Sequence, residues 1–284
     1  MAYVFTAFHL SYFEGFLFMQ TFIYFRLLVK HGGITSLNVS GSKLSDVHTD
    51  ILKSLLGNMK ELWVQNCRFT EKQVNTIFQQ ISDGQSDLET LYIGNNRLTG
   101  ARAELLRGAV SRLRVLHCDN TNLCPSQVTE MLEGIKEVED LKLEEINLNM
   151  NTMTPVNNLL LSESLSRIKS VKLYGCEAIL MSLLNRIYDR QSNTEHLDIG
   201  DNNLTDYPAA FIAGAITNCV YASLYACEMT SNQVSFLIHQ IKTKANLRLK
   251  HLKMSGRFTA DEREKIESVS EYLDHLEFHN FMIL

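Results

Sequence analysis

Apolar residues recur along this chain in a fixed arrangement, which is clearest between Leu88 and Leu98. The segment LETLYIGNNRL has apolar residues at its first, fourth, sixth and eleventh positions and Asn96 at its ninth. The alternation of Leu91 and Ile93 predicts a short strand whose two side chains enter a core. Asn96 can turn the chain and hydrogen-bond to neighbouring backbone groups. One such unit cannot bury its own apolar face, so several must stack.

The same pattern can be followed from Ile34 to the end of the chain. The first inward residue of each predicted strand is Leu37, Leu62, Leu91, Leu116, Leu141, Val171, Leu197, Ala222, Leu252 or Leu276. The second follows two positions later, at Val39, Val64, Ile93, Cys118, Leu143, Leu173, Ile199, Leu224, Met254 or Phe278. Successive units are 24 to 30 residues apart. This period is typical of an α/β leucine-rich repeat solenoid of about ten repeats, a horseshoe with a parallel sheet on the concave face and helices on the convex face.

The segments between the strands are amphipathic. Val74, Phe78 and Ile81 share one face of a helix expected over Glu71–Ser82, and Asp46–Leu56 follows the same spacing. A Thr or Ser that can cap free backbone N–H groups stands where each of six helices should begin, at Thr70, Thr99, Ser126, Thr205, Thr230 and Thr259. Full helices require repeats in the high twenties, which favours the ribonuclease-inhibitor-like subclass.

Residues 1–33 differ from the rest, with ten of the chain's 25 aromatic residues in the first thirty positions. A signal peptide would have a basic start and a small-residue cleavage site, and this segment has neither. A membrane helix needs about 20 apolar residues, and the uncharged runs of residues 1–25 are shorter, although a membrane contact there is not excluded. We expect residues 1–33 to be a helical cap, or the remnant of a preceding helical domain, and residues 34–284 to be the repeat domain.

Charge and cysteine usage narrow the functional classes. The net charge of −5 argues against nucleic acid, which requires a basic face. Cys67, Cys176 and Cys227 stand where the repeat takes Asn or Cys, so we interpret them as buried, reduced thiols. Reduced cysteines favour a cytoplasmic protein.

The sequence lacks the motifs that usually carry catalysis: no glycine-rich phosphate loop, H-E-x-x-H or G-x-S-x-G is present. We therefore predict no enzymatic activity and no cofactor. His275 and His279 fall on a predicted strand, where they lack the ligand geometry of a helical metal pair. His117 and Asp119 are interpreted as an ordinary solvent-facing pair.

The residue between the two inward positions of each strand should face the concave side. These residues are Asn38, Trp63, Tyr92, His117, Lys142, Lys172, Asp198, Ser223, Lys253 and Glu277. Adjacent strands lie about 4.8 Å apart, so Trp63, Tyr92 and His117 should form one aromatic stripe. The candidate site for another protein comprises Trp63, Tyr92, His117, Lys142, Lys172 and Tyr174. The alternatives are that these aromatics only pair across strands for stability, or that the N-terminal segment covers them.

The N-terminal segment adds a family resemblance. Phe8-His9-Leu10-Ser11-Tyr12-Phe13-Glu14 resembles the F-x-H-L-[ST]-[FV]-Q-E-F-L-A-A stretch that precedes the repeats of NOD-like (NACHT-containing) innate immune receptors. Phe13 replaces the Gln of that stretch, Gly15 intrudes and the Ala pair is missing. The resemblance implies the C-terminal repeat region of such a receptor, which contacts ligands or holds the receptor inactive.

The leading hypothesis is a ligand-sensing or protein-recognition module that uses the concave sheet. A second is an adaptor or regulator, either for substrate recognition by a ubiquitin ligase or for a GTPase, although the F-box-like segment and acidic tail of such proteins are absent. A third is a membrane-tethered leucine-rich repeat receptor.

Overall fold

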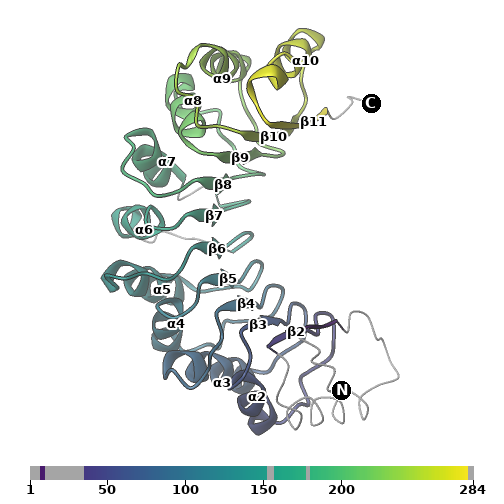
Figure 1. Cartoon of the computed structure of the whole chain (residues 1–284), viewed down its shortest axis with the longest axis vertical. Coiled ribbons are helices and arrows are strands. Elements are labelled where there is room, and N and C mark those ends of the chain that lie inside the picture. Colours follow the sequence, from purple (N-terminus) through teal and green to yellow (C-terminus); the bar gives the residue numbers. More distant parts are fainter. Residues whose placement is uncertain (1–6, 10–34, 152–156, 177–179, 281–284) are drawn as a thin grey trace, which may run out of the picture. The chain divides into compact units, whose positions relative to one another are not determined.

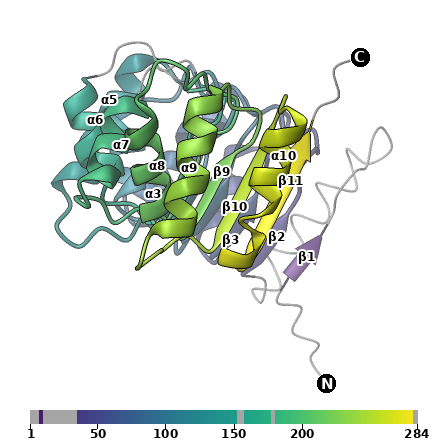
Figure 2. The ribbon, with the colours of Figure 1, turned by 90° about the horizontal axis from the view of Figure 1, so that it is seen from above.

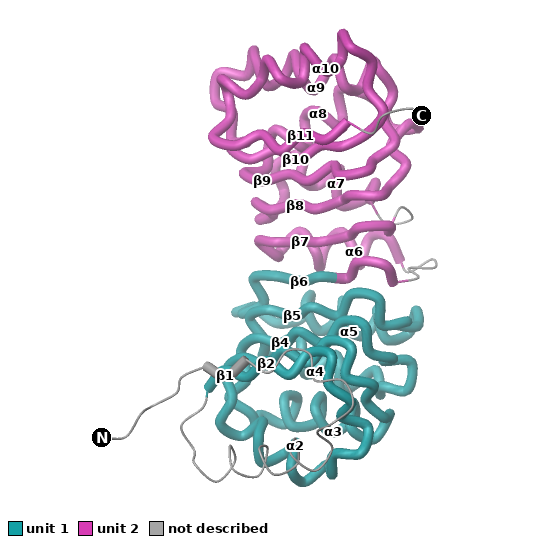
Figure 3. Tube along the Cα trace, turned by 90° about the vertical axis from the view of Figure 1, so that its right-hand side faces the viewer, with its two compact units in different colours: residues 1–147 teal, residues 148–284 magenta. Residues whose placement is uncertain are grey.

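The computed structural model describes residues 7–9, 35–151, 157–176 and 180–280. The chain divides into two compact units, Met1–Asn147 and Leu148–Leu284, here called unit 1 and unit 2 (Figure 3). Each alternates short strands with helices, as the repeat pattern predicts.

In unit 1 the strands pair in parallel and in sequence order. Helices α2 to α5 lie on one side of this sheet (Figure 1). We call the opposite side of the sheet the front face. The elements are β1 (Ala7–His9), β2 (Ser36–Asn38), α2 (Thr49–Leu56), β3 (Glu61–Trp63), α3 (Glu71–Ser82), β4 (Thr90–Tyr92), α4 (Ala103–Val110), β5 (Val115–His117), α5 (Pro125–Glu137) and β6 (Glu145–Asn147).

Unit 2 continues the same alternation, and β7 to β11 are parallel and in sequence order. Its elements are α6 (Asn158–Leu165), β7 (Ser170–Lys172), α7 (Leu180–Tyr188), β8 (His196–Asp198), α8 (Ala209–Asn218), β9 (Tyr221–Leu224), α9 (Ser231–Thr243), β10 (His251–Gly256), α10 (Ala260–Glu267), the 3₁₀ turn η2 (Ser270–Tyr272) and β11 (His275–Asn280).

The core lies between strands and helices and is built from the inward positions of the repeat. Leu91 and Ile93 are fully buried, as are Leu197 and Ile199 in unit 2. Burying one such side chain contributes about 1.5–3 kcal/mol, so the regular leucines are the main source of stability.

The predicted register fails at the fifth strand. The sequence pattern puts the inward residues at Leu141 and Leu143, but β6 pairs Ile146 with Leu116 of β5. The motif that follows Ile146 explains the choice, because Asn151 then occupies the asparagine position and donates from Nδ2 to the Leu148 carbonyl at 3.1 Å. Leu141 and Leu143 belong to the segment that leads into the strand.

The asparagine position ties each turn to a strand by a hydrogen bond. In unit 1, Asn96 Nδ2 donates to the carbonyls of Val64 at 2.7 Å and Ile93 at 2.8 Å. Cysteines at this position do the same with sulfur, as the prediction of buried thiols requires. The bonds are Cys67 Sγ to Val39 O at 3.3 Å, Cys176 Sγ to Leu148 O at 3.6 Å and Cys227 Sγ to Ile199 O at 3.0 Å.

The predicted helix starts are confirmed at Thr70, Thr230 and Thr259, each of which accepts from the backbone N–H of the third helical residue. Three others are wrong, because α4, α5 and α8 begin after Arg102, Cys124 and Pro208 rather than at Thr99, Ser126 and Thr205. Proline is pre-organised for a first helical turn, which places the start of α5 at Pro125.

Three buried glutamines join neighbouring repeats in a way that the pattern did not predict. Gln127 is the third residue of α5, and its Oε1 accepts a hydrogen bond from the N–H of Cys124 at 2.8 Å. Its Nε2 donates to the carbonyls of Leu98 at 2.8 Å and Ala101 at 2.6 Å in the preceding turn. Gln73 and Gln233 repeat this arrangement in α3 and α9. One side chain thus caps a helix and fixes the preceding turn.

Of residues 1–33 the structure describes only Ala7–His9, and these form a strand rather than part of a helix. This strand, β1, pairs with β2 in the register Phe8 to Leu37 (Figure 2). The expected helical cap, and the signal and membrane alternatives, otherwise lie outside the described residues. Within the described ranges, none of the helices has the length and apolar character to cross a bilayer.

Candidate interaction surface

Trp63, Tyr92 and His117 lie side by side on the front face of unit 1, and we call them the aromatic stripe. They end consecutive strands and pair directly in the register of β3, β4 and β5. The rings of Trp63 and Tyr92 stack, with centroids 5.1 Å apart and planes 6° from parallel. Tyr92 and His117 meet edge to face at 4.4 Å and 65°. The predicted stripe is therefore present, and it is continuous.

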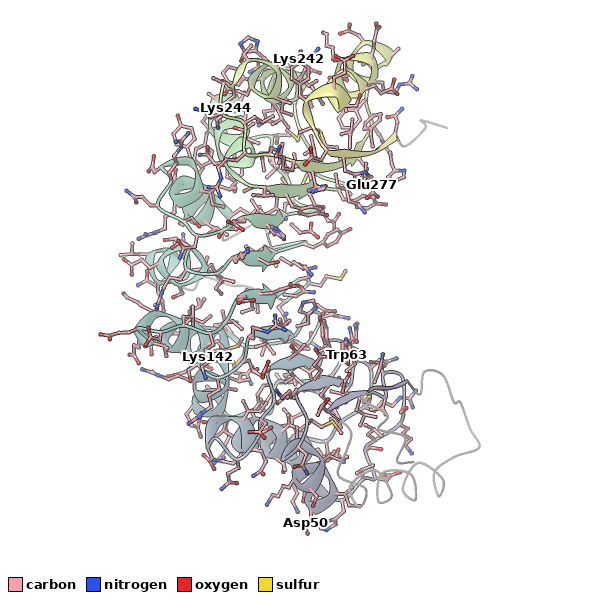
Figure 4. The ribbon with its side chains drawn as sticks, in the orientation of Figure 1. Asp50, Trp63, Lys142, Lys242, Lys244 and Glu277 are labelled. Atoms are coloured by element: carbon pink, nitrogen blue, oxygen red, sulfur yellow. The ribbon has the colours of Figure 1, made fainter. Side chains whose placement is uncertain are left out.

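The three side chains of the stripe are not equally exposed. Trp63 and Tyr92 are half-buried, whereas His117 is only 8% exposed. The two half-buried rings are the part of the stripe that a partner could reach, and His117 supports them from one side. Figure 4 labels Trp63 on the side of the sheet away from the helices.

His117 is bonded to Glu145 of β6, with 2.7 Å between Nε2 and Oε1. The interpretation of His117 and Asp119 as a solvent-facing pair is thus wrong. Asp119 instead accepts from the Nδ2 atoms of Asn95 and Asn147, each at 3.3 Å. The corrected register of β6 brings Glu145 and Asn147 to the front face, and for that reason sequence analysis missed them.

The surroundings of Tyr92 are acidic. Burial raises the pKa of its phenol, and the negative charges of Glu145 and Glu61 raise that pKa further, while Arg114 opposes them.

Lys142, predicted as part of the site, does not lie on the front face. It precedes β6 and lines a surface pocket of about 480 Å³ together with Lys60, Arg112 and Glu89. In Figure 4 it is labelled toward the helical side, apart from Trp63. Asn147 pairs with His117 and so takes the front-face position that the register predicted from the sequence gave to Lys142.

Lys172 and Tyr174 belong to unit 2. Lys172 ends β7 and pairs in register with Asp198 of β8. The Tyr174 ring lies against Gly200, where an added Cβ would come within 2.7 Å of its Cδ2 atom, so a glycine is required there. Burial first, and then the charge of Asp201, raise the pKa of Tyr174. Of the six predicted residues, Trp63, Tyr92 and His117 thus form one cluster in unit 1, Lys172 and Tyr174 lie in unit 2, and Lys142 lies off the front face.

Unit 2 carries a row that the prediction did not include. His196, Tyr221, His251 and His275 begin β8 to β11 and pair in register. Ring centroids are 6.1 Å apart for His196 and Tyr221 and 6.3 Å for His251 and His275. The sequence could have revealed this row, because each of these residues directly precedes the first inward residue of its strand. Among the described residues, no group of three or more His, Cys, Asp or Glu side chains is arranged to hold a metal ion.

A solved structure of a known protein shares this architecture. No family model and no curated protein sequence matches the chain. Among solved structures, the leucine-rich repeat-containing protein LegL7 from Legionella pneumophila is similar, with a TM-score of 0.54, 14% identity, and coverage of 87% of this chain and 84% of that one. The leucine-rich repeat domain of APL1B matches with a TM-score of 0.42 and 14% identity over 94% of this chain and 75% of that one. At this identity the likeness to LegL7 shows the fold alone: the chain has an α/β leucine-rich repeat fold.

Proposed function

We propose that the chain is a protein-recognition module and that the aromatic stripe of unit 1 is the centre of its binding surface. The fold supports the general role, because leucine-rich repeats typically serve as interaction modules rather than enzymes. The specific proposal rests on one observation: the rings of Trp63 and Tyr92 stack on each other. This stacking fixes both rings before a partner binds.

Preordered aromatic side chains suit a binding surface. Half-buried Trp and Tyr side chains supply large contact areas and lose few rotamers on binding, so they dominate many interfaces. The hydrogen bond between His117 and Glu145 anchors the inner end of the stripe, which further reduces the entropy lost on association.

The cellular setting is part of the same proposal. The resemblance of residues 8–14 to NOD-like receptors supports a sensor or autoinhibitory repeat region, and the six cysteines described as free thiols are in keeping with a cytoplasmic location. The long helices α3, α5 and α9, of 12, 13 and 13 residues, favour the ribonuclease-inhibitor-like subclass.

The test is quantitative affinity capture with the full chain as bait. The double variant Trp63→Ala, Tyr92→Ala removes both reachable rings, and Tyr272→Ala removes a 46% exposed aromatic ring from unit 2 as a matched control. A partner retained by the wild type and by the control but lost with the double variant supports the proposal. Equal retention by all three contradicts it.

A further inference from the structure

We propose that the front face of unit 1 binds an arginine side chain from a basic segment of the partner protein. The guanidinium would lie against the ring of Trp63 and hydrogen-bond to the carboxylate of Glu61. This inference rests on the function proposed above and adds the chemistry of the partner to it.

Along the described strands β2 to β6, the front face of unit 1 carries formal charge of one sign. Over strands β2 to β6, the charged side chains are Glu61 and Glu145, and both are acidic. Arg114 lies just before β5 and forms an ion pair with Glu144 at 3.4 Å. The face therefore attracts cations and disfavours anionic segments.

The backbone N–H of Glu61 donates to Thr35 O at 3.0 Å, but its carboxylate has no hydrogen bond or ion pair with any residue that the structure describes. Its neighbours in register are Ser36 of β2 and Thr90 of β4, neither of which is cationic. A carboxylate that lacks a partner gains a charge-assisted hydrogen bond when a cation binds beside it. Glu145, by contrast, is already bonded to His117.

Trp63 stands on the same side of β3 as Glu61, two residues along the strand. One face of its ring is used in the stack with Tyr92, and on its other flank the register partner is Asn38, a small polar residue. Tryptophan is the strongest cation–π acceptor among the side chains. A flat guanidinium can stack on an indole and donate to a carboxylate together, which an ammonium cannot do as well, so arginine fits better than lysine.

The corresponding strand positions of unit 2 carry charges of both signs, at Lys172, Asp198, Lys253 and Glu277. The carboxylate of Glu277 already forms an ion pair with Lys253 at 2.8 Å. Lys253 also lies over the Tyr225 ring, 5.0 Å from its centroid. Unit 2 thus supplies internally the cation–π and carboxylate contacts that unit 1 leaves for a partner.

Trp63 is the only tryptophan of the chain, so its fluorescence reports on the site directly. The probe is a capped, labelled peptide of alternating Arg and Gly, compared with peptides in which citrulline or Lys replaces Arg. Citrulline keeps the shape and removes the charge. Binding is followed by Trp63 fluorescence in the wild type and by anisotropy of the labelled peptide in every variant.

We expect the Arg peptide to bind about tenfold more tightly than the citrulline peptide, with Lys between them. Glu61→Gln should weaken Arg-peptide binding about threefold or more and reduce its dependence on salt. Glu264→Gln, the same change at an exposed site on α10, should leave binding unchanged.

Equal binding of the Arg and citrulline peptides, an unaltered affinity of the Glu61→Gln variant, or no binding at millimolar peptide would each overturn the inference. If the Arg peptide fails while affinity capture still depends on Trp63 and Tyr92, only the chemistry of the partner is wrong. If affinity capture does not depend on these two residues, the proposed function itself fails.

Discussion

Trp63 and Tyr92 stack almost in parallel, with planes 6° apart, although 29 residues separate them in the sequence. The relationship follows from the repeat: equal positions on neighbouring parallel strands face the same way and pair in register. A repeat fold therefore converts a sequence period into a row of side chains on one surface. In unit 1 that row is aromatic and its surroundings are acidic.

Replacing Gln127 by Ala should lower the free energy of unfolding by about 2–3 kcal/mol, because it leaves the Cys124 N–H and two turn carbonyls without their partner. Urea denaturation followed by circular dichroism measures this change. Gln191→Ala, at an exposed site in unit 2, is the control and should cost little. Equal effects of the two variants would show that Gln127 does not join the repeats.

Asn96→Ala should lower the free energy of unfolding by about 1–3 kcal/mol, because it removes the hydrogen bonds to Val64 O and Ile93 O. Asn96→Cys should lower it less, because a buried cysteine makes the equivalent hydrogen bond at position 67. Asn96→Cys keeps a weak donor directed at Val64, whereas Asn96→Ala has none. Thermal unfolding of both variants tests the order of stability. The opposite order would contradict the equivalence of Asn and Cys in this turn.

Cys124 should be alkylated before the other five cysteines near neutral pH. Burial raises the pKa of its thiol, but hydrogen bonds from Ser126 and from backbone N–H groups at the start of α5 outweigh this, so the net shift is downward. Burial raises the pKa of Cys176 to about 11 and that of Cys67, Cys219 and Cys227 to about 12. Cys118 is shifted upward as well.

Since the thiolate is the reactive form, a lower pKa raises the reactive fraction of Cys124 at pH 7. Limited iodoacetamide treatment and peptide mass spectrometry measure the order of modification. The preference should fade in denaturant, where all six thiols are exposed. Uniform labelling of the folded chain would be inconsistent with the environments described here.

Lys142→Ala should leave partner binding unchanged, because Lys142 precedes β6 and lines a pocket away from the front face. The register predicted from the sequence would instead place Lys142 on the front face beside His117. Measuring partner affinity for Lys142→Ala and for Trp63→Ala distinguishes the two registers. An equal loss of affinity in both variants would support the register predicted from the sequence.

Sequence alone predicts most of the strand register and the aromatic stripe, because both depend on a regular period. It fails at β6, where Leu141 and Leu143 imitate a strand five residues before the true one. Asn151 would have resolved this, because it follows Ile146 by five positions, as Asn96 follows Leu91, whereas the residue five positions after Leu141 is neither Asn nor Cys. The bond between His117 and Glu145 could not be foreseen, because it depends on that corrected register and on side-chain geometry.

The helix starts show a second limit of sequence patterns. Arg102 provides no side-chain cap for α4; instead Asn75 of α3 accepts the Arg102 N–H at 2.8 Å and donates to Gly100 O at 3.0 Å. A cap supplied by the neighbouring repeat leaves no trace next to the helix it serves. The buried glutamines escape prediction for the same reason, because their partners lie 26 to 29 residues away.

We propose to measure the dissociation constant of the captured partner for the wild type and for Trp63→Ala, because this pair of values shows whether the front face of unit 1 binds through the aromatic stripe. We predict a loss of more than about 1 kcal/mol, roughly a fivefold rise in Kd, with an unchanged circular dichroism spectrum. An unchanged Kd in a natively folded Trp63→Ala variant would show that the aromatic stripe is not the binding surface.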